Sequence, residues 1–191
     1  MQQEREVWLV RHGETEWSRD GRHTSRTDLP LTERGEAAAA VLAEALHSVA
    51  FDAVLTSPRE RARRTAELAG FSQARLDDDL VEWDYGEYEG ISTPQIRESV
   101  PNWTVWTHPS PRGETADEVG SRIDRAIARL DTGQGRALVF GHSHALRVVA
   151  ARWLGQPVSH GRFFKLDTAT ISVLGYERET PVLLRWNSPV R

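Results

Sequence analysis

The 191-residue sequence contains no cysteine, which excludes disulfide bonds, thiolate chemistry and cysteine-type zinc sites together. It also lacks the run of about 18 apolar residues that a membrane-spanning helix requires. Basic charge is not in excess, because 24 Lys and Arg stand against 28 Asp and Glu and the net charge is -4. Nucleic acid and membranes are therefore not expected as partners, and any anion site must be a local cluster of cations.

The N-terminal residues 1–6 are polar and lead directly into an apolar run, which is not the pattern of a signal peptide. The absence of cysteine also fits a reducing compartment, so a cytoplasmic location is expected. The length fits one domain over residues 1–191. The sequence leaves a monomer and a homodimer open.

Short apolar runs alternate with amphipathic stretches, a pattern that predicts strands and helices in turn. We expect a three-layer α/β/α fold, with a mostly parallel open sheet and helices on both faces. The last two runs, joined by residues 177–181, are expected to form an antiparallel pair at the sheet edge. The five runs cover residues 7–10, 53–55, 137–140, 170–174 and 182–186.

Capping signals predict where the helices begin. Thr115 and Glu118 form a capping box before an apolar stripe, and Ser57 is expected to cap a helix with Pro58 at its first position. Further helices are expected over residues 32–49 and 144–154.

Two segments fall outside the alternation of strands and helices. Residues 18–30 are polar and predict a long ordered loop, and residues 83–113, rich in tryptophan, tyrosine, proline and glycine, predict a lid-like insertion. Long loops in compact domains are often functional.

Polar residues that can bind phosphate follow the first predicted strand. Arg11, His12 and Gly13 lie at its carboxyl end, the edge where open α/β sheets bind ligands. An imidazole nitrogen can attack phosphorus, and a guanidinium can hold phosphoryl oxygens. Taken alone, this segment could equally be an exposed Arg-His pair.

Four arginines follow the second strand, and helical spacing separates them. Arg61 shares a stripe with Thr65, whereas Arg63 and Glu67 stand at i,i+4 on another stripe, as a solvated ion pair would. Arg61 is therefore predicted to point inward, near a helix N-terminus that favours anions. The alternative is a basic helix that serves only solubility.

His142, Ser143 and His144 follow the third strand. His142 is predicted to donate a hydrogen bond to phosphate, either protonated or as the neutral ring in the right tautomer, and to be more useful as a cation. A weaker alternative is a metal pair of His142 and His144, because alternate residues on a strand share a face.

A carboxyl group is needed to protonate the leaving alkoxide, and the segment 82–90 offers several. Glu82 comes first after a strand predicted at Leu80-Val81. Glu87 and Glu89 also qualify by type, and spacing does not choose between Glu82 and Asp84.

The motifs together resemble the histidine phosphatase, or phosphoglycerate mutase-like, superfamily in order over nearly the whole chain. By this resemblance, His12 is the phosphorylated nucleophile, Arg11, Arg61 and His142 form the phosphate pocket, and Glu82 donates and accepts the proton. It implies no metal or other cofactor. The motifs are Arg11-His12-Gly13-Glu14-Thr15, Leu29-Pro-Leu-Thr-Glu-Arg-Gly35, Ser57-Pro58 with Arg61-Ala62 and Thr65-Ala66, Glu82 with Gly86-x-x-x-Gly90, and Gly141-His142.

Within the family, the sequence is most similar to small actinobacterial mutase-like acid phosphatases. Residues 82–90 also resemble the fungal sedoheptulose-bisphosphatase branch. Phosphoglycerate mutases carry Asn where this chain has Ser18, and their double-arginine insertion is not recognisable between Gly90 and Arg112.

The resemblance therefore implies an acid phosphatase that hydrolyses either a broad range of phosphate esters or those of sugars and other small metabolites. A phosphoglycerate mutase and a non-catalytic module that binds a phosphorylated ligand remain alternatives. His144 replaces a small residue and receives no role. The expected substrate-binding residues are Ser18, Thr24, Arg26, Trp103, Trp106, Arg112 and Ser143.

Overall fold

The computed structural model describes residues 5–130 and 135–190, so most of the N-terminal segment whose polarity argued against a signal peptide lies outside the described residues. The strands are β1 (Glu6–Arg11), β2 (Ala53–Thr56), β3 (Arg75–Leu76), β4 (Arg136–Gly141), β5 (Thr170–Glu177) and β6 (Thr180–Pro189). The α-helices are α1 (Glu16–Arg19), α2 (Glu33–His47), α3 (Glu60–Leu68), α4 (Thr93–Ser99), α5 (Ala116–Leu130) and α6 (Ser143–Trp153).

The strands form one sheet in the order β3-β2-β4-β1-β5-β6. The β3-β2, β2-β4 and β4-β1 pairs are parallel, and β5 pairs antiparallel with both β1 and β6. The mostly parallel sheet and its antiparallel edge pair are as predicted. Strand β3 was not predicted, because it is short and both of its residues are exposed.

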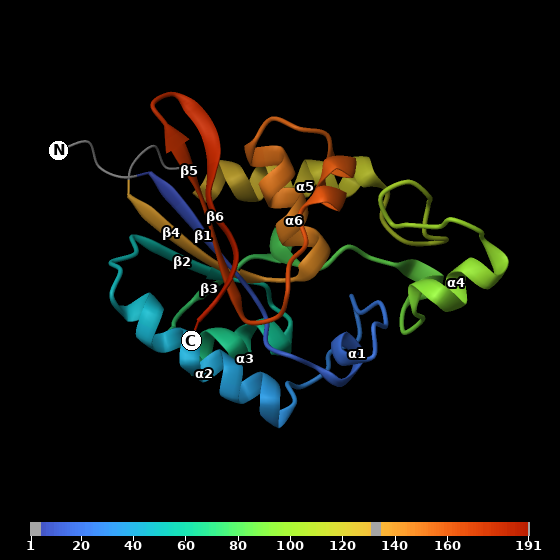
Figure 1. Ribbon diagram of the computed structural model, residues 1–191, viewed down its shortest axis with the longest axis horizontal. Coiled ribbons are helices and arrows are strands. Elements are labelled where there is room, and N and C mark those ends of the chain that lie inside the picture. The colour runs from blue at the N-terminus through green and yellow to red at the C-terminus, as the bar shows by residue number, and fades with distance from the viewer. Residues whose placement is uncertain (1–4, 131–134, 191) are drawn as a thin grey trace.

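Helices cover both faces of the sheet, which confirms the three-layer fold (Figure 1). Side chains of β4 alternate between the faces, as a strand requires. Leu138 and Phe140 pack toward α2 and α3, whereas Ala137 and Val139 pack toward α5 and α6. In the described part of the chain, no helix is long and apolar enough to cross a membrane.

Of the two predicted helix caps, one is correct and one is wrong. The Thr115–Glu118 capping box stands before α5 as predicted, and Thr32, for which no cap was predicted, caps α2. Helix α3, however, begins at Glu60 after Arg59 rather than at Ser57. The Ser57 hydroxyl is instead bonded to His142, so the local capping signal was overridden by a contact from another strand end.

The segment before Glu82 is not a strand, contrary to the prediction for Leu80-Val81. Residues Asp78–Leu80 form a 3-10 turn, because the Asp77 side chain accepts from the Asp79 amide and caps it.

The short helix α1 ends at Arg19, at the start of the predicted long loop, and the predicted lid-like insertion contains α4. The insertion extends to one side of the sheet (Figure 1). The two segments are joined by hydrogen bonds between His23 and the backbone of Gly90 and Ile91. That residues 83–113 act as a lid stays a prediction.

Candidate active site

The carboxyl ends of β1, β2 and β4 meet at one edge of the sheet, and the predicted phosphate-binding residues come together there. Arg11, His12 and Glu82 border a cleft of about 160 Å³, whereas Arg61 and His142 are fully buried and lie outside its lining. The cleft is lined by Arg11, His12, Ser18, Gly21, Arg22, His23, Thr24, Glu82, Tyr85, Ser143 and His144.

His12 is held in one tautomer by its own loop. Its Nδ1 lies 2.7 Å from the Gly13 carbonyl oxygen, and because a carbonyl only accepts, Nδ1 carries the proton. Burial, then the Arg61 and Arg11 cations, lower the pKa of His12 well below its ordinary value of 6.5. The neutral ring therefore keeps a free lone pair on Nε2.

The backbone at Gly13 is fixed by a close approach. Its amide donates to the Thr65 hydroxyl at 2.9 Å, and a Cβ at this position would lie 2.5 Å from the Gly35 carbonyl oxygen. Glycine is therefore required here, because no side chain fits between β1 and the start of α2.

The Arg11 guanidinium is anchored through one nitrogen and has an unpaired donor on another. Its Nη1 donates to the Leu166 carbonyl oxygen at 2.6 Å. Among the described residues, none accepts from its buried Nε. Burial lowers the pKa of Arg11, and the Glu82 carboxylate opposes this shift. An unpaired guanidinium N–H beside a cleft suits an anionic ligand.

Arg61 points inward as predicted and is 0% exposed. Its Nε donates to Nδ1 of His142 at 3.2 Å, while Nε2 of His142 lies 2.7 Å from the Ser57 hydroxyl. The rings of His12 and His142 are 5.3 Å apart between centroids. The basic stripe differs from the prediction on one point, because Glu67 pairs with Arg64 rather than with Arg63.

The prediction that His142 acts as a cation is not supported. Burial, then Arg61, then His12 lower the pKa of His142 well below 6.5. Its Nδ1 accepts from Arg61, so in the neutral ring Nε2 carries the proton and donates to Ser57.

The proposed metal pair of His142 and His144 fails for a geometric reason. Strand β4 ends at Gly141 and α6 begins at Ser143, so the two rings do not share a strand face. The rings are bonded to different partners, since Nδ1 of His144 bonds to the Tyr85 hydroxyl. The described residues contain no cluster of three or more His, Asp or Glu placed to hold a metal ion.

Glu82 is placed in the cleft by the N-terminus of α6. Its Oε1 accepts from the amides of Trp83 and Ala145, and its Oε2 accepts from the His144 amide at 3.1 Å. The Asp84 carboxylate instead accepts from Arg26 and from the Gly86 amide in its own turn, and the Asp84 amide donates to Glu114 in the opposite loop. Of the two carboxylates that spacing left open, Glu82 lines the cleft and Asp84 does not.

The lining of the cleft also includes His23, Tyr85 and His144. The Tyr85 hydroxyl and Nδ1 of His144 are 2.5 Å apart, and the rings of His23 and Tyr85 are 4.6 Å apart between centroids. Burial lowers the pKa of His23 to about 4, although Glu89 opposes the shift. Sequence reasoning missed His23 and Tyr85, although both lie in the two irregular segments that it marked as functional.

Three predicted substrate-binding residues, Ser18, Thr24 and Ser143, line the cleft. The other four lie outside its lining. Trp103 is buried in the core and Trp106 packs against Trp83 and His144, so these rings support the cleft wall from behind.

The two arginines of this group are drawn outward by acidic neighbours. The side chain of Arg112 is 85% exposed and pairs with Glu87. Arg26 is also exposed, and it pairs with Asp84.

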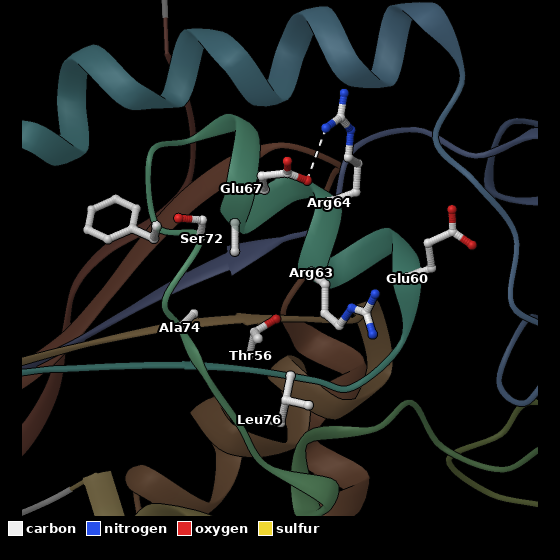
Figure 2. A pocket seen from close by; sticks show the side chains of 10 residues that line it. Thr56, Glu60, Arg63, Arg64, Glu67, Ser72, Ala74 and Leu76 are labelled. Carbon is white, nitrogen blue, oxygen red and sulfur yellow. Dashed lines mark hydrogen bonds and ion pairs between the residues drawn. The ribbon is translucent and has the colours of Figure 1, made fainter.

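A larger hollow of about 560 Å³ lies on the outer side of α3, between that helix and residues 71–76 (Figure 2). Figure 2 shows the Arg64–Glu67 pair on one wall and Leu76 on the opposite wall. None of the predicted catalytic residues borders it. Chemistry rather than size therefore identifies the smaller cleft as the candidate active site.

The model of the histidine phosphatase superfamily (branch 1) matches residues 7–189. The chain belongs to this superfamily. An acid phosphatase of Mycobacterium tuberculosis is 44% identical over 173 residues, covering 88% of this chain and 85% of the relative. The sedoheptulose 1,7-bisphosphatase of Saccharomyces cerevisiae is 39% identical over 180 residues, covering 77% and 66%.

The fold is similar to a solved structure as well. The structure of an open reading frame from Mycobacterium tuberculosis matches with a TM-score of 0.94 and 39% identity, covering 98% of this chain and 99% of that one. Together with the family match, these similarities identify the chain as a histidine-type phosphatase enzyme.

Proposed function

We propose that this histidine phosphatase hydrolyses small phosphate monoesters through a phosphohistidine formed on His12. The observation that supports this most is the tautomer of His12, which leaves Nε2 unprotonated in a cleft bordered by Arg11. Arg11, Arg61 and His142 are proposed to hold the phosphoryl oxygens and to stabilise the charge that develops on them.

Glu82 is proposed to move the proton in both half-reactions. In the first, Nε2 of His12 forms a bond to phosphorus, the ester P–O bond breaks, and the Glu82 carboxyl protonates the leaving alkoxide. In the second, the Glu82 carboxylate takes a proton from water, the water oxygen attacks phosphorus, and the P–N bond breaks to release phosphate. We also propose an acidic pH optimum, because the first half-reaction uses the protonated form of the Glu82 carboxyl.

The size of the cleft supports small substrates. A volume of about 160 Å³ is below the range of about 300–1,000 Å³ that is usual for drug-sized ligands. A sugar phosphate or another small-metabolite phosphate is therefore favoured over a phosphoprotein. We further propose that the enzyme works without a metal ion, since its own cations surround the phosphate position, and that it acts in the cytoplasm.

Trapping the phosphoenzyme tests the proposal. Wild-type protein mixed with a radiolabelled sugar phosphate and quenched should retain label that is stable in base and labile in acid, whereas His12→Ala should retain none. Turnover should persist in chelator. Label on the His12→Ala variant would overturn the proposal, and interconversion of 2- and 3-phosphoglycerate at a rate above hydrolysis would favour the mutase alternative.

A further inference from the structure

Arg61 is a buried cation that, among the described residues, has no carboxylate within hydrogen-bond distance. The nearest carboxylate oxygen with which it forms an ion pair belongs to the half-exposed Asp28, 3.9 Å from Nη1. Three backbone carbonyls accept from its terminal nitrogens instead, those of Thr24, Ser25 and Thr27, at 3.0–3.2 Å. A buried charge is costly unless such partners are held firmly.

The loop that supplies these carbonyls is itself held by Glu89. Both carboxylate oxygens of Glu89 accept from the Ser25 amide, at 2.9 and 3.0 Å. The Ser25 hydroxyl donates to Oε2 at 2.6 Å, and the Thr27 amide donates to Oε1 at 2.9 Å. Glu89 thereby fixes the amide side of the same short loop whose carbonyl side binds Arg61.

One peptide group connects the two charges. The Thr24 carbonyl and the Ser25 amide belong to the same planar unit, whose oxygen faces Arg61 and whose N–H faces Glu89. Its dipole is therefore aligned favourably with the cation at one end and the anion at the other. Through this unit, a carboxylate of the 83–113 insertion supports a guanidinium on α3.

We infer that Glu89 is a positioning residue for the reaction, holding the loop 24–27 so that Arg61 presents its guanidinium to His142 and to the phosphate. This inference rests on the proposed function, because it assumes that Arg61 binds the transferred phosphoryl group. It gives the insertion a part in building the phosphate site. Glu89 was a candidate proton donor by residue type, and its contacts assign it to the loop rather than to the cleft.

The test is a double-mutant cycle with Glu89→Gln, Arg61→Ala and their combination. Glu89→Gln keeps the shape of the side chain but loses the charge and half of the acceptors. We expect kcat/KM to fall roughly 10- to 100-fold, because small displacements of a catalytic group have effects of that size. The inhibition constant of inorganic phosphate should rise in the same variant.

A positioning role predicts that the two substitutions are not additive. In the Arg61→Ala background, Glu89→Gln should change phosphate inhibition by less than about twofold, since there is no guanidinium left to position. If the changes in phosphate inhibition of the two single variants multiply in the double variant, the inference is overturned, because Glu89 then acts independently of Arg61. The thermal midpoint and circular dichroism of each variant identify any loss of folding, and phosphate inhibition is measured only on the folded fraction.

Glu87→Gln is the matched control, because Glu87 lies in the same segment and, among the described residues, forms its ion pair with exposed Arg112 at 3.0 Å and with no other side chain. It should leave activity and phosphate inhibition unchanged. If Arg61→Ala itself leaves phosphate inhibition unchanged, the proposed function is wrong about Arg61. If Arg61→Ala weakens inhibition but Glu89→Gln does not, only the positioning role is overturned.

Discussion

The two ends of the cleft are built in different ways. At the phosphate end, β1 and β4 deliver Arg11, His12 and His142 directly from their carboxyl ends. At the part of the cleft where we propose that the leaving group binds (the leaving-group end), His23 and Tyr85 come from loops that hold each other through backbone hydrogen bonds. Strand ends give one fixed geometry, whereas loops can change without disturbing the sheet. The chemistry is therefore expected to depend on the first end and the choice of substrate on the second.

The largest effect is expected at the phosphate end. His12→Ala should reduce hydrolysis of p-nitrophenyl phosphate to background, because no other described group offers Nε2 at this position. His47→Ala, which removes an exposed histidine on α2, is the control and should retain wild-type rates. Steady-state assays of p-nitrophenyl phosphate hydrolysis by both variants test this prediction. Measurable burst kinetics in His12→Ala would contradict the assignment.

Glu82→Gln should show the next largest effect. Its kcat on alkyl phosphates should fall by about 10²–10⁴-fold, since proton delivery to the alkoxide is lost. The rate of the first half-reaction should fall less with p-nitrophenyl phosphate, because its leaving group needs little protonation. Rapid-quench measurement of phosphoenzyme formation on both substrates tests this. Equal losses of rate on the two substrates would show that Glu82 is not the proton donor.

A moderate effect on selectivity is expected at the leaving-group end. His144→Ala removes the ring that bonds Tyr85, and it should change the KM ratio between a pentose phosphate and a hexose phosphate by about tenfold. Trp103→Ala, behind the wall, should instead lower the free energy of unfolding by about 3–5 kcal/mol.

A panel of sugar phosphates and denaturant unfolding measure the two outcomes. A selectivity change in Trp103→Ala as large as that in His144→Ala would place the tryptophan in contact with substrate.

The smallest effect concerns stability against pH. His23 has a pKa of about 4 in the folded protein against 6.5 ordinarily, because burial disfavours its charged form. As pH falls from 6.5 toward 4, the unfolded chain binds a proton that the folded chain does not, so stability is lost across this window. His23→Gln should reduce that loss, by at most about 1.4 kcal/mol per pH unit.

Denaturant unfolding of wild type and His23→Gln between pH 4 and 7.5 is the measurement. The control is His47→Gln, since His47 is exposed. An unchanged slope in His23→Gln would mean that His23 does not titrate across this window.

The sequence alone determined the fold class and the phosphate end, and the reason is local. Apolar runs predict the strands, and residues directly after a parallel strand must lie at the ligand-binding edge of the sheet. Helical spacing was enough to turn Arg61 inward and Arg63 outward. Short elements such as β3 show neither an apolar run nor a helical spacing in the sequence, so they were not predicted.

The tertiary structure decided what depends on distant partners. It holds Glu82 in the cleft through amides of α6, bonds the Ser57 hydroxyl to His142 where a helix cap was predicted, and lowers the pKa of His142 by burial. It also placed His23 and Tyr85 in the cleft and Glu89 behind Arg61. No spacing along the chain encodes these contacts, because each joins segments whose approach is set by the packed sheet and helices between them.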